Sequence, residues 1–396
     1  MIARLQAERL VAAFQQLPAV VLSGARQTGK TTLVRNLWPQ ATYVSLDWPE
    51  KAAQAQETPE AFLRGLAGPA IIDEVQYAPE LFRHLKILID EDRRPGRFVL
   101  TGSQTFALMQ GVSESLAGRC AALELSTLSA GELDLGPERA AVEAALWRGG
   151  YPELWARPDL SREMWLASYV TTYLERDVRS ALAVGSLRDF DRFLRMAALR
   201  CGQLLNFSEL ARDVGIAPNT AKTWLSVLQA SGVVFLLEPW HRQRNKRLIK
   251  TPKLYFADTG LLTLLLGFAS PADLQAHSLW GAVWENWVVA EVRKAIPRAM
   301  GTPALWCWRT AAGDEVDLLV EIAPERFLAV ECKAAAQVDR SAARGLLALR
   351  TELGATAVPV ALIACRTETA YPLPGGDIVA VPVPGGDGLL TRLQRH

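Results

Sequence analysis

The sequence has few of the residues that hold metal clusters, and it has no apolar run long enough to cross a membrane. Its five cysteines include no C-x-x-C pair, and none of its four histidines lies at metal-ligand spacing from another. This scarcity argues against a structural zinc site. The most apolar stretch, residues 260–269, is far too short for a membrane span. The first residues predict an amphipathic helix and not a secretion signal, so we expect a cytoplasmic protein without membrane contact.

The chain also lacks an excess of either charge. Its 43 Lys and Arg residues nearly balance 42 Asp and Glu residues, which leaves a formal net charge of +1 over 396 residues. Any contact with nucleic acid must therefore come from a local basic patch and not from the chain as a whole. Half of the residues are hydrophobic, and this length predicts two or three globular domains.

A phosphate-binding motif follows the apolar run of residues 19–22. The pattern G-x-x-x-x-G-K-T spans Gly24 to Thr31, and its glycines allow backbone N–H groups to surround the phosphates of a nucleotide. In this motif the lysine reaches the β- and γ-phosphates, and the Thr31 hydroxyl binds Mg²⁺. We predict nucleotide contacts by the following residues of the loop and helix start: Gly24, Ala25, Gln27, Thr28, Gly29, Lys30, Thr31 and Thr32.

Two carboxylates end a short apolar segment downstream and complete the predicted site. Asp73 and Glu74 follow Pro69-Ala70-Ile71-Ile72, and acidic groups beside such a strand are costly unless a cation neutralises them. Asp73 is placed to hold Mg²⁺, and Glu74 is placed to orient or deprotonate the attacking water. The alternative is an acidic pair on the surface.

Apolar strands and helical stretches alternate from residue 19 to about residue 125, which predicts a mainly parallel sheet wrapped by helices. One strand, residues 97–101, ends at Gly102 and Ser103. Thr101 or Ser103 can contact the γ-phosphate there and respond to its hydrolysis. The alternative is an ordinary turn at the end of a strand. We place Arg119 on the same side of the sheet, where it can reach a neighbouring subunit's γ-phosphate if subunits form a ring, or else remain a solvated arginine.

The middle of the chain predicts helices and a hairpin. The helical pattern breaks near residues 147–153 and resumes at 169–179, which indicates a small helical lid. Three further helices are expected over 190–205, 207–214 and 217–232. Strands over 233–237 and 253–256 then resemble the wing of a helix-turn-helix unit. The connecting residues 241–253 contain no acid, and they predict a DNA contact through Arg242, Arg244, Lys246, Arg247 and Lys250. A solvated charge run and a protein-docking surface are the alternatives.

A second constellation lies near the C-terminus. Glu285 shares a helix face with apolar residues, and strands over 315–320 and 328–333 carry Asp317, Glu331 and Lys333. Folding a hairpin at residues 324–326 brings Asp317 opposite Glu331. Three carboxylates of this kind suit Mg²⁺, and Lys333 can stabilise the charge that develops on phosphorus during cleavage. The cluster is therefore a metal-dependent nuclease site, a degenerate nuclease-like binding site, or a buried ion-pair cluster.

Taken in order, these motifs resemble a large prokaryotic family of AAA+-type ATPases. The resemblance covers about residues 17–336 and rests on the P-loop and on Ile-Ile-Asp-Glu, Leu-Thr-Gly-Ser, Leu-Ala-Gly-Arg, Arg-Gly-Gly-Tyr-Pro-Glu, Tyr-Leu-Glu-Arg-Asp, Glu-Val-Asp and Glu-Cys-Lys. In that family an AAA domain precedes a C-terminal domain of unknown function with a winged helix and a PD-(D/E)XK nuclease-like region. The resemblance implies that Lys30, Thr31, Asp73 and Glu74 form the nucleotide site with Arg119 as arginine finger. It also implies Glu285, Asp317, Glu331 and Lys333 as a nuclease-like quartet, although Val316 stands where that pattern has proline.

We therefore expect an α/β protein with four parts. These are a parallel-sheet P-loop ATPase core over residues 1–135, a helical lid over 136–185, a winged helix over 186–257 and an α/β nuclease-like domain over 258–396. The first functional hypothesis is an ATP- and Mg²⁺-dependent protein that binds DNA and can form a homo-oligomeric ring. The alternatives are a regulatory switch that acts on a protein partner and an ATP-gated endonuclease.

Overall fold

The N-terminal unit is a parallel sheet because its strands are short and apolar on both faces. The computed structural model describes residues 2–103, 112, 114–174, 187–241, 251–296 and 305–395. The sheet has the strand order β2-β3-β4-β1-β5, and every neighbouring pair in it is parallel. Its strands are β1 (Ala19–Ser23), β2 (Thr42–Ser45), β3 (Ala70–Asp73), β4 (Phe98–Gly102) and β5 (Cys120–Glu124).

Alternate residues of these strands pack against helices on opposite faces of the sheet. The helices are α1 (Ala7–Gln16), α2 (Lys30–Leu37), α3 (Pro49–Glu57), α4 (Pro59–Arg64) and α5 (Leu81–Glu91), with a 3₁₀ turn η1 (Val75–Tyr77). Val20 and Leu22 pack with α1 and α2, whereas Ala19 and Val21 pack with the helices α3 to α5 on the other face. The predicted parallel sheet is confirmed, and all strand C-termini meet at one edge, where Ser23 and Asp73 lie.

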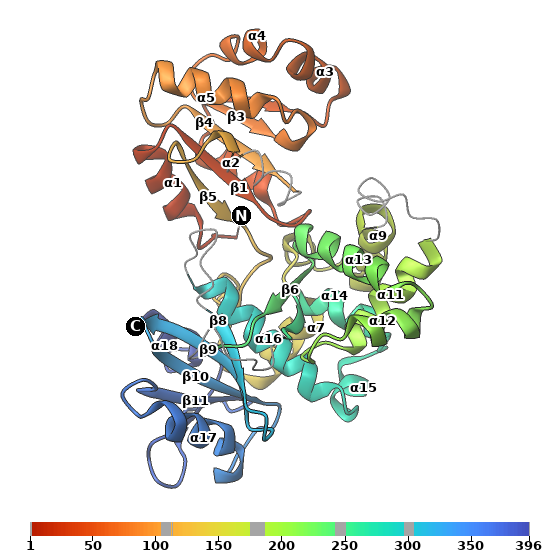
Figure 1. Ribbon diagram of the computed structural model, residues 1–396, viewed down its shortest axis with the longest axis vertical. Helices are drawn as coiled ribbons and strands as arrows, with labels where there is room; N and C mark the ends of the chain where they lie inside the picture. The colour runs from red at the N-terminus through yellow and green to blue at the C-terminus, as the bar shows by residue number, and fades with distance from the viewer. Residues whose placement is uncertain are drawn as a thin grey trace.

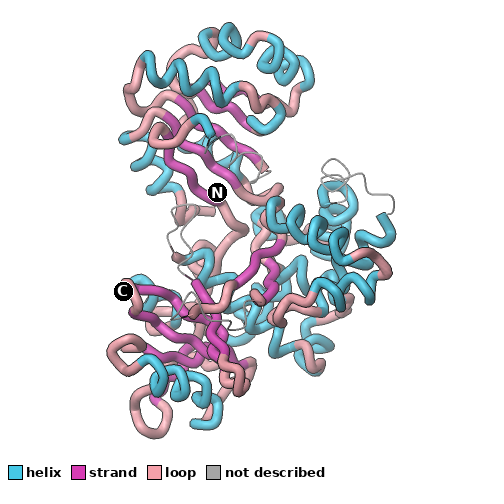
Figure 2. The backbone as a smooth tube through the Cα atoms, viewed as in Figure 1, coloured by secondary structure: helices cyan, strands magenta, loops and turns pink. Residues whose placement is uncertain are grey.

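A helical unit lies at the right of the view, below the N-terminal sheet domain and beside the C-terminal sheet (Figures 1 and 2). Its first part contains α7 (Arg139–Arg148), α8 (Pro152–Ala156), α9 (Arg162–Tyr169) and the π-helical turn η2 (Val170–Leu174). Three helices follow: α11 (Leu187–Leu199), α12 (Phe207–Val214) and α13 (Pro218–Ala230). The antiparallel pair β6 (Val234–Leu237) and β7 (Lys253–Phe256) comes next, and α14 (Thr259–Leu266) and α15 (Pro271–Ala276) complete the unit.

The expected helices that follow residue 187 and the hairpin are present, with one clear difference, whereas residues 175–179 of the helical stretch expected at 169–179 lie outside the described residues. The first helix was expected to extend to residue 205, but α11 ends at Leu199. Gly202 adopts φ +74° and its N–H bonds to the carbonyl of Leu254, so the chain leaves the helix to run beside β7. A left-handed residue of this kind ends a helix at little steric cost only when it is glycine.

The C-terminal unit is a six-stranded mixed sheet with the order β12-β13-β11-β10-β9-β8. Helix α16 (Trp280–Ala295) contributes to the core on one face, and α17 (Arg344–Leu353) contributes to the core on the other. The strands are β8 (Leu305–Arg309), β9 (Glu315–Ala323), β10 (Arg326–Lys333), β11 (Val360–Cys365), β12 (Tyr371–Pro372) and β13 (Val379–Val381), with the 3₁₀ turn η3 (Arg340–Ala343) and a final helix α18 (Leu389–Gln394). The hairpin expected about residue 324 is confirmed as β9 and β10.

The hydrophobic core continues across the boundaries drawn from the sequence. One cluster of buried residues includes Leu146 of α7, Phe193 of α11, Leu262 of α14, Val288 of α16 and Val330 of β10. The boundaries expected after residues 185 and 257 therefore do not coincide with breaks in this core. Among the described helices, none is long and apolar enough to cross a membrane.

Candidate functional site

The P-loop is shaped by glycines at both ends. Gly24 has φ +146°, and a Cβ there would lie 2.2 Å from the carbonyl oxygen of Leu125. Gly29 has φ +90° and immediately precedes α2, which begins at Lys30. Both glycines have a left-handed backbone. In addition, Gly24 lies too close to Leu125 for a Cβ, and Gly29 directly precedes a helix, which explains why the motif has glycine at both positions. The Thr28 hydroxyl donates to the carbonyl of Ala25 at 2.9 Å, which closes the loop on itself.

Lys30 lies inside the loop, 5% exposed. Its Nζ donates to the carbonyl oxygens of Gly24 and Ala25, each at 2.9 Å. Burial lowers the pKa of Lys30 to about 8, although Glu74 and Asp73 act in the opposite direction. The ammonium is thus held by neutral backbone acceptors, with the two carboxylates close enough to influence its charge.

Asp73 receives three hydroxyl donors at the end of β3. The Thr31 and Tyr43 hydroxyls both donate to Oδ2 at 2.8 Å, and the Thr101 hydroxyl donates to Oδ1. Thr31 and Asp73, which were each expected to hold Mg²⁺, are therefore in contact with each other. Burial first, and then the hydrogen bond to Asp73, raises the pKa of Tyr43 to about 12, so Tyr43 remains a donor.

Glu74 leaves the strand with φ +56°, which turns its side chain toward the end of β4. Its Oε2 accepts from Ser103 Oγ at 2.9 Å and from Gln76. Burial opposes ionisation, but Lys30 and the hydrogen bonds from Gln76 and Ser103 together hold the pKa of Glu74 below its ordinary value. Near neutral pH the group is therefore a carboxylate that can accept a proton.

A cavity of about 410 Å³ opens beside the P-loop. Arg4 fixes one wall, because its guanidinium donates to the carbonyl of Thr28 at 2.7 Å and to that of Ser126 at 2.6 Å. Its Nε also pairs with Glu132 at 3.0 Å. The lining residues come from the N-terminal segment, the P-loop, α2, the segment after β5, and α8: Ile2, Arg4, Gln27, Gly29, Thr32, Leu33, Leu128, Pro152, Glu153 and Ala156.

The outer side of the P-loop touches the helical unit. Gly232, in the turn after α13, lies so close that an added Cβ would be 3.3 Å from the backbone nitrogen of Ala25. At the neighbouring strand, Arg293 of α16 pairs with Glu124 of β5 at 3.0 Å. The nucleotide loop is therefore packed directly against the part of the chain that carries the β6–β7 hairpin.

Arg119 does not lie where the sequence analysis placed it. It precedes β5, and β5 runs parallel to β1, so Arg119 lies at the edge where the strands begin. The P-loop follows the opposite end of β1. Arg119 pairs with Asp90 at 2.7 Å and therefore faces away from the nucleotide loop of its own chain.

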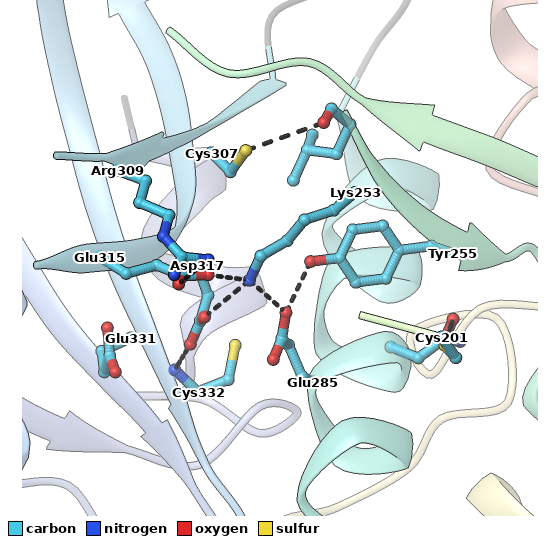
Figure 3. Close-up of polar contacts among 12 residues, drawn as sticks. Cys201, Lys253, Tyr255, Glu285, Cys307, Arg309, Glu315, Asp317, Glu331 and Cys332 are labelled. Atoms are coloured by element: carbon cyan, nitrogen blue, oxygen red, sulfur yellow. Dashed lines mark hydrogen bonds and ion pairs between the residues drawn. The ribbon is translucent and has the colours of Figure 1, made fainter. Parts of the chain in front are cut away.

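Two members of the second constellation, Glu285 and Asp317, meet around a lysine that the sequence analysis included in the basic stretch of residues 241–253 (Figure 3). Lys253 is 4% exposed and begins β7. Its Nζ lies 2.9 Å from Glu285 Oε1 and 3.3 Å from Asp317 Oδ1, and it also pairs with Glu315. The inclusion of Lys253 in the basic stretch of residues 241–253 is thus wrong, because its side chain is buried among carboxylates.

Glu331 and Lys333 form a neighbouring pair in this cluster. Their Oε1 and Nζ atoms are 2.7 Å apart, whereas Glu331 Oε2 is buried with no hydrogen-bond partner among the described residues. Burial, followed by repulsion from Asp317, raises the pKa of Glu331 to about 8 and that of Glu285 to about 7. Across the part of the chain that the structure describes, no group of three or more His, Cys, Asp or Glu side chains is arranged to hold a metal ion.

The basic residues expected to contact DNA fall outside the described residues. Arg242, Arg244, Lys246, Arg247 and Lys250 belong to the stretch between residues 241 and 251.

Comparisons with known proteins identify the parts of the chain. Family models described as "AAA domain", "Domain of unknown function (DUF8612)" and "Domain of unknown function (DUF4143)" match residues 16–134, 139–272 and 280–385. Two uncharacterized proteins, from Mycobacterium bovis and Mycobacterium tuberculosis, are each 35% identical over 390 residues, which is 97% of this chain and 84% of each relative. The chain belongs to the family of these mycobacterial proteins. Its nucleotide site is that of an AAA-type ATPase domain, and a DUF4143 region follows near the C-terminus.

Solved structures show more distant similarity. A Walker-type ATPase of Pyrococcus abyssi is 18% identical, with a TM-score of 0.43, over 67% of this chain and 96% of that one. DnaA from Aquifex aeolicus, bound to AMPPCP, is 14% identical, with a TM-score of 0.27, over 56% and 85%.

Several site residues of this family member were missed by the sequence analysis. Tyr43 and Gln76 reach the two acidic residues from segments without a recognised motif. Arg4 was passed over as part of an amphipathic helix start. A signal for Lys253 did exist, since it begins an apolar strand and not a polar loop. Its partners could not be named without the packing of β7 against α16 and β9.

Proposed function

We propose that this protein hydrolyses ATP with Mg²⁺ at the P-loop and couples the nucleotide state to DNA bound by its middle unit. The observation that carries the catalytic part is the Thr31 hydroxyl on Asp73 Oδ2 at 2.8 Å, with Glu74 next in the chain. A hydroxyl and a carboxylate are oxygen ligands of the kind that Mg²⁺ prefers. Thr31 and Asp73 fit such an ion, which would neutralise charge on the phosphates when bound.

In this proposal Lys30 changes partners when nucleotide binds. The carbonyl oxygens of Gly24 and Ala25 are neutral acceptors, whereas phosphate oxygens are charged and form stronger hydrogen bonds with an ammonium. Binding would therefore draw Lys30 toward the phosphates and stabilise its ammonium form. Glu74 accepts a proton from the attacking water, and Ser103 and Gln76 hold its carboxylate in place.

The cavity beside the P-loop suits the nucleoside part of the substrate. Leu33, Leu128, Pro152 and Ala156 supply apolar surface, and Glu153 is a polar group at its edge. Nucleoside sites of this type are mostly apolar with a few orienting polar groups. Because α8 contributes to this cavity, nucleotide binding would be felt directly by the helical unit.

For the DNA part, support comes from the order of elements and from charge. We interpret α11, α12, α13 and the β6–β7 hairpin as a winged helix, and the basic residues between the two strands would lie at its wing. The exposed side of α13 is polar without acids and includes Asn219, Lys222, Thr223 and Ser226. We do not propose phosphodiester cleavage, because Lys253 lies among the carboxylates that would have to bind a metal.

The decisive experiment is steady-state ATP turnover with single-stranded, duplex or branched DNA at moderate salt, with Glu74→Gln as the blank. Stimulation by one form would support the proposal and identify the class of DNA. Arg244→Gln/Lys246→Gln/Arg247→Gln should remove this stimulation and leave basal turnover unchanged. If no DNA form changes turnover, the DNA part fails, and a switch that acts on a protein partner becomes the better explanation.

We also propose that ATP favours a homo-oligomer in which Arg119 approaches a neighbouring subunit's nucleotide. The support is its position at the far edge of the sheet from its own P-loop. Mass measurement of Glu74→Gln with ATP should show an assembly larger than one chain. A strictly monomeric mass would remove this role from Arg119.

A further inference from the structure

Arg4 comes from the segment before α1, yet its side chain reaches the P-loop. This side chain is 7% exposed, and that of its carboxylate partner Glu132 is 5% exposed. The guanidinium donates through separate nitrogens to Glu132 Oε1 at 3.0 Å, to the carbonyl of Thr28 at 2.7 Å and to the carbonyl of Ser126 at 2.6 Å. A planar guanidinium presents its donors in fixed directions. Arg4 therefore fixes the P-loop to the segment that follows β5.

Glu132 holds the guanidinium in place from the other side. Its Oε1 also accepts from the backbone N–H of Leu5 at 2.8 Å. Its Oε2 accepts from the backbone N–H of Ser129 at 2.9 Å. Because the carboxylate balances the charge of Arg4 within a nearly buried pair, Arg4 provides the P-loop with fixed donors and not with an excess of positive charge.

The contact with Thr28 determines the direction of one peptide group of the P-loop. In a planar trans peptide, the C=O and the N–H of the next residue point in opposite directions. Since the carbonyl of Thr28 points toward Arg4, the N–H of Gly29 points away from Arg4. Gly29 has φ +90° and lacks the Cβ that would restrict rotation of this peptide. A charged donor on the carbonyl favours the observed orientation over a rotated one.

We propose that Arg4 is a positioning residue for phosphate binding, which aims the N–H of Gly29 at the phosphates of the nucleotide. Backbone N–H groups of this motif surround the phosphates, and a group that already points at them needs no reorientation when the ligand arrives. Arg4 lies outside residues 16–134, which the AAA-domain model matches. Its role rests on the proposed function, because it concerns phosphate binding at the same site.

A direct contact of Arg4 with the nucleoside is the competing explanation, because Arg4 also lines the cavity beside the P-loop. The two explanations differ in the ligands that they affect. Tripolyphosphate has the phosphates of ATP but no nucleoside. Loss of an aimed N–H group weakens the binding of ATP and of tripolyphosphate alike, whereas loss of a nucleoside contact weakens the binding of ATP alone.

The test is displacement of a fluorescent ATP analogue by ATP and by tripolyphosphate, both with Mg²⁺. Arg4→Met keeps the apolar stem and removes every donor. It should weaken the binding of both competitors about tenfold, the scale of one hydrogen bond to a charged group. Arg350→Met is the matched control and should keep both native affinities. Arg350 also donates to three backbone carbonyls, but in the C-terminal unit, at Val358, Asp377 and Pro359.

A second readout separates the missing donors from a folding defect. Methylguanidinium at millimolar concentration should restore the affinity of Arg4→Ala for tripolyphosphate and should leave that of the native protein unchanged. If Arg4→Met does not fold, Arg4→Met/Glu132→Gln, which also removes the unpaired carboxylate, takes its place.

The outcomes separate the role of Arg4 from the proposed function. Native affinity of the folded variant for tripolyphosphate, weakening of ATP alone, or no restoration by methylguanidinium would overturn the role of Arg4 and leave the proposed function standing. Absence of ATP binding by the native protein would refute the proposed function, and the role of Arg4 with it.

Discussion

Two buried lysines, Lys30 and Lys253, are surrounded by opposite chemistry. Lys30 donates to two neutral carbonyls, and burial lowers its pKa to about 8. Lys253 is similarly buried, yet its partners are carboxylates, and they raise its pKa far above the ordinary value despite the cost of burial. In the nucleotide-free protein the charge of Lys30 is therefore incompletely compensated by its partners, whereas the charge of Lys253 is fully compensated.

This difference separates a binding group from a structural one. A partly compensated ammonium gains energy when an anion arrives, because charged acceptors replace neutral ones. A fully paired ammonium has little to gain from a ligand, and its removal leaves unpaired buried charges. The comparison implies that the two lysines respond to the same substitution in opposite ways.

The largest expected effect is on ATP hydrolysis and belongs to the Lys30 region. Glu74→Gln should bind ATP but lower turnover by roughly 1,000-fold, since a positioned general base contributes about 100- to 10,000-fold. Lys30→Ala should fail at the binding step, whereas Lys253→Arg should change neither step. Turnover and equilibrium binding of a fluorescent ATP analogue distinguish these results. Unchanged turnover in Glu74→Gln would remove Glu74 from its assigned role.

The second-largest expected effect is a loss of stability when Lys253 is replaced. Lys253→Met should lower the free energy of unfolding by about 3–5 kcal/mol, because breaking a buried ion pair on one side leaves uncompensated charge. Denaturant unfolding of the nucleotide-free protein measures the change. A loss below about 1 kcal/mol, the range of an exposed pair, would show that the carboxylates are already neutral or hydrated without Lys253.

The same substitution at Lys30, Lys30→Met, should raise the free energy of unfolding and not lower it. Burial of the Lys30 ammonium lowers its pKa by about 2.5 units from 10.5 to about 8, which corresponds to about 3 kcal/mol of unfavourable free energy below pH 8. Because Lys30→Met also leaves two carbonyls without their donor, we expect a net stabilisation of only about 1 kcal/mol. ATP binding should be lost at the same time.

The pH dependence provides a second check on Lys30. Between pH 8 and 10.5 the unfolded chain holds this proton more tightly than the folded protein does. Native stability should therefore rise with pH in this window relative to Lys30→Met. Chemical unfolding of metal- and nucleotide-free samples at pH 7.5 and pH 10 measures the difference. A constant difference would mean that the Lys30 ammonium is not desolvated in solution.

The same contrast explains what could be predicted from the sequence. The nucleotide site is built from local segments, so the motif at Gly24 to Thr31 and the strand ending at Asp73 were enough to propose Thr31 and Asp73 as ligands of Mg²⁺, and the two side chains are in contact. The hairpin register likewise follows from residue alternation and brought Asp317 near Glu331. Both successes depend on short-range geometry that the order of residue types fixes.

The failures share a different cause. The position of Arg119 depends on the direction in which β5 joins the sheet, and the partners of Lys253 depend on packing between distant elements. Tyr43 was missed because its contact with Asp73 requires β2 to lie next to β3. Strand order and packing between units involve residues far apart in the chain, and a single sequence carries little information about them.

The smallest expected effect tests whether the P-loop communicates with the helical unit that lies beside it. Gly232 and Gly215 both follow helices with left-handed backbone, at φ +69° and +85°. A Cβ at Gly232 would meet Ala25 of the P-loop at 3.3 Å, whereas a Cβ at Gly215 has nothing within 4 Å. Alanine at either position should cost about 1 kcal/mol of stability through backbone strain.

Only the substitution at Gly232 should also affect the nucleotide. Because Gly232→Ala displaces the turn after α13 or the P-loop by a few tenths of an ångström, we expect ATP binding to weaken about threefold, which corresponds to about 0.6 kcal/mol. Gly215→Ala should leave the affinity unchanged, so calorimetric titration of both variants separates the P-loop contact from general strain. Equal affinities would mean that this contact is passive packing, and the coupling of nucleotide state to the hairpin would then have to run through Arg293 and Glu124.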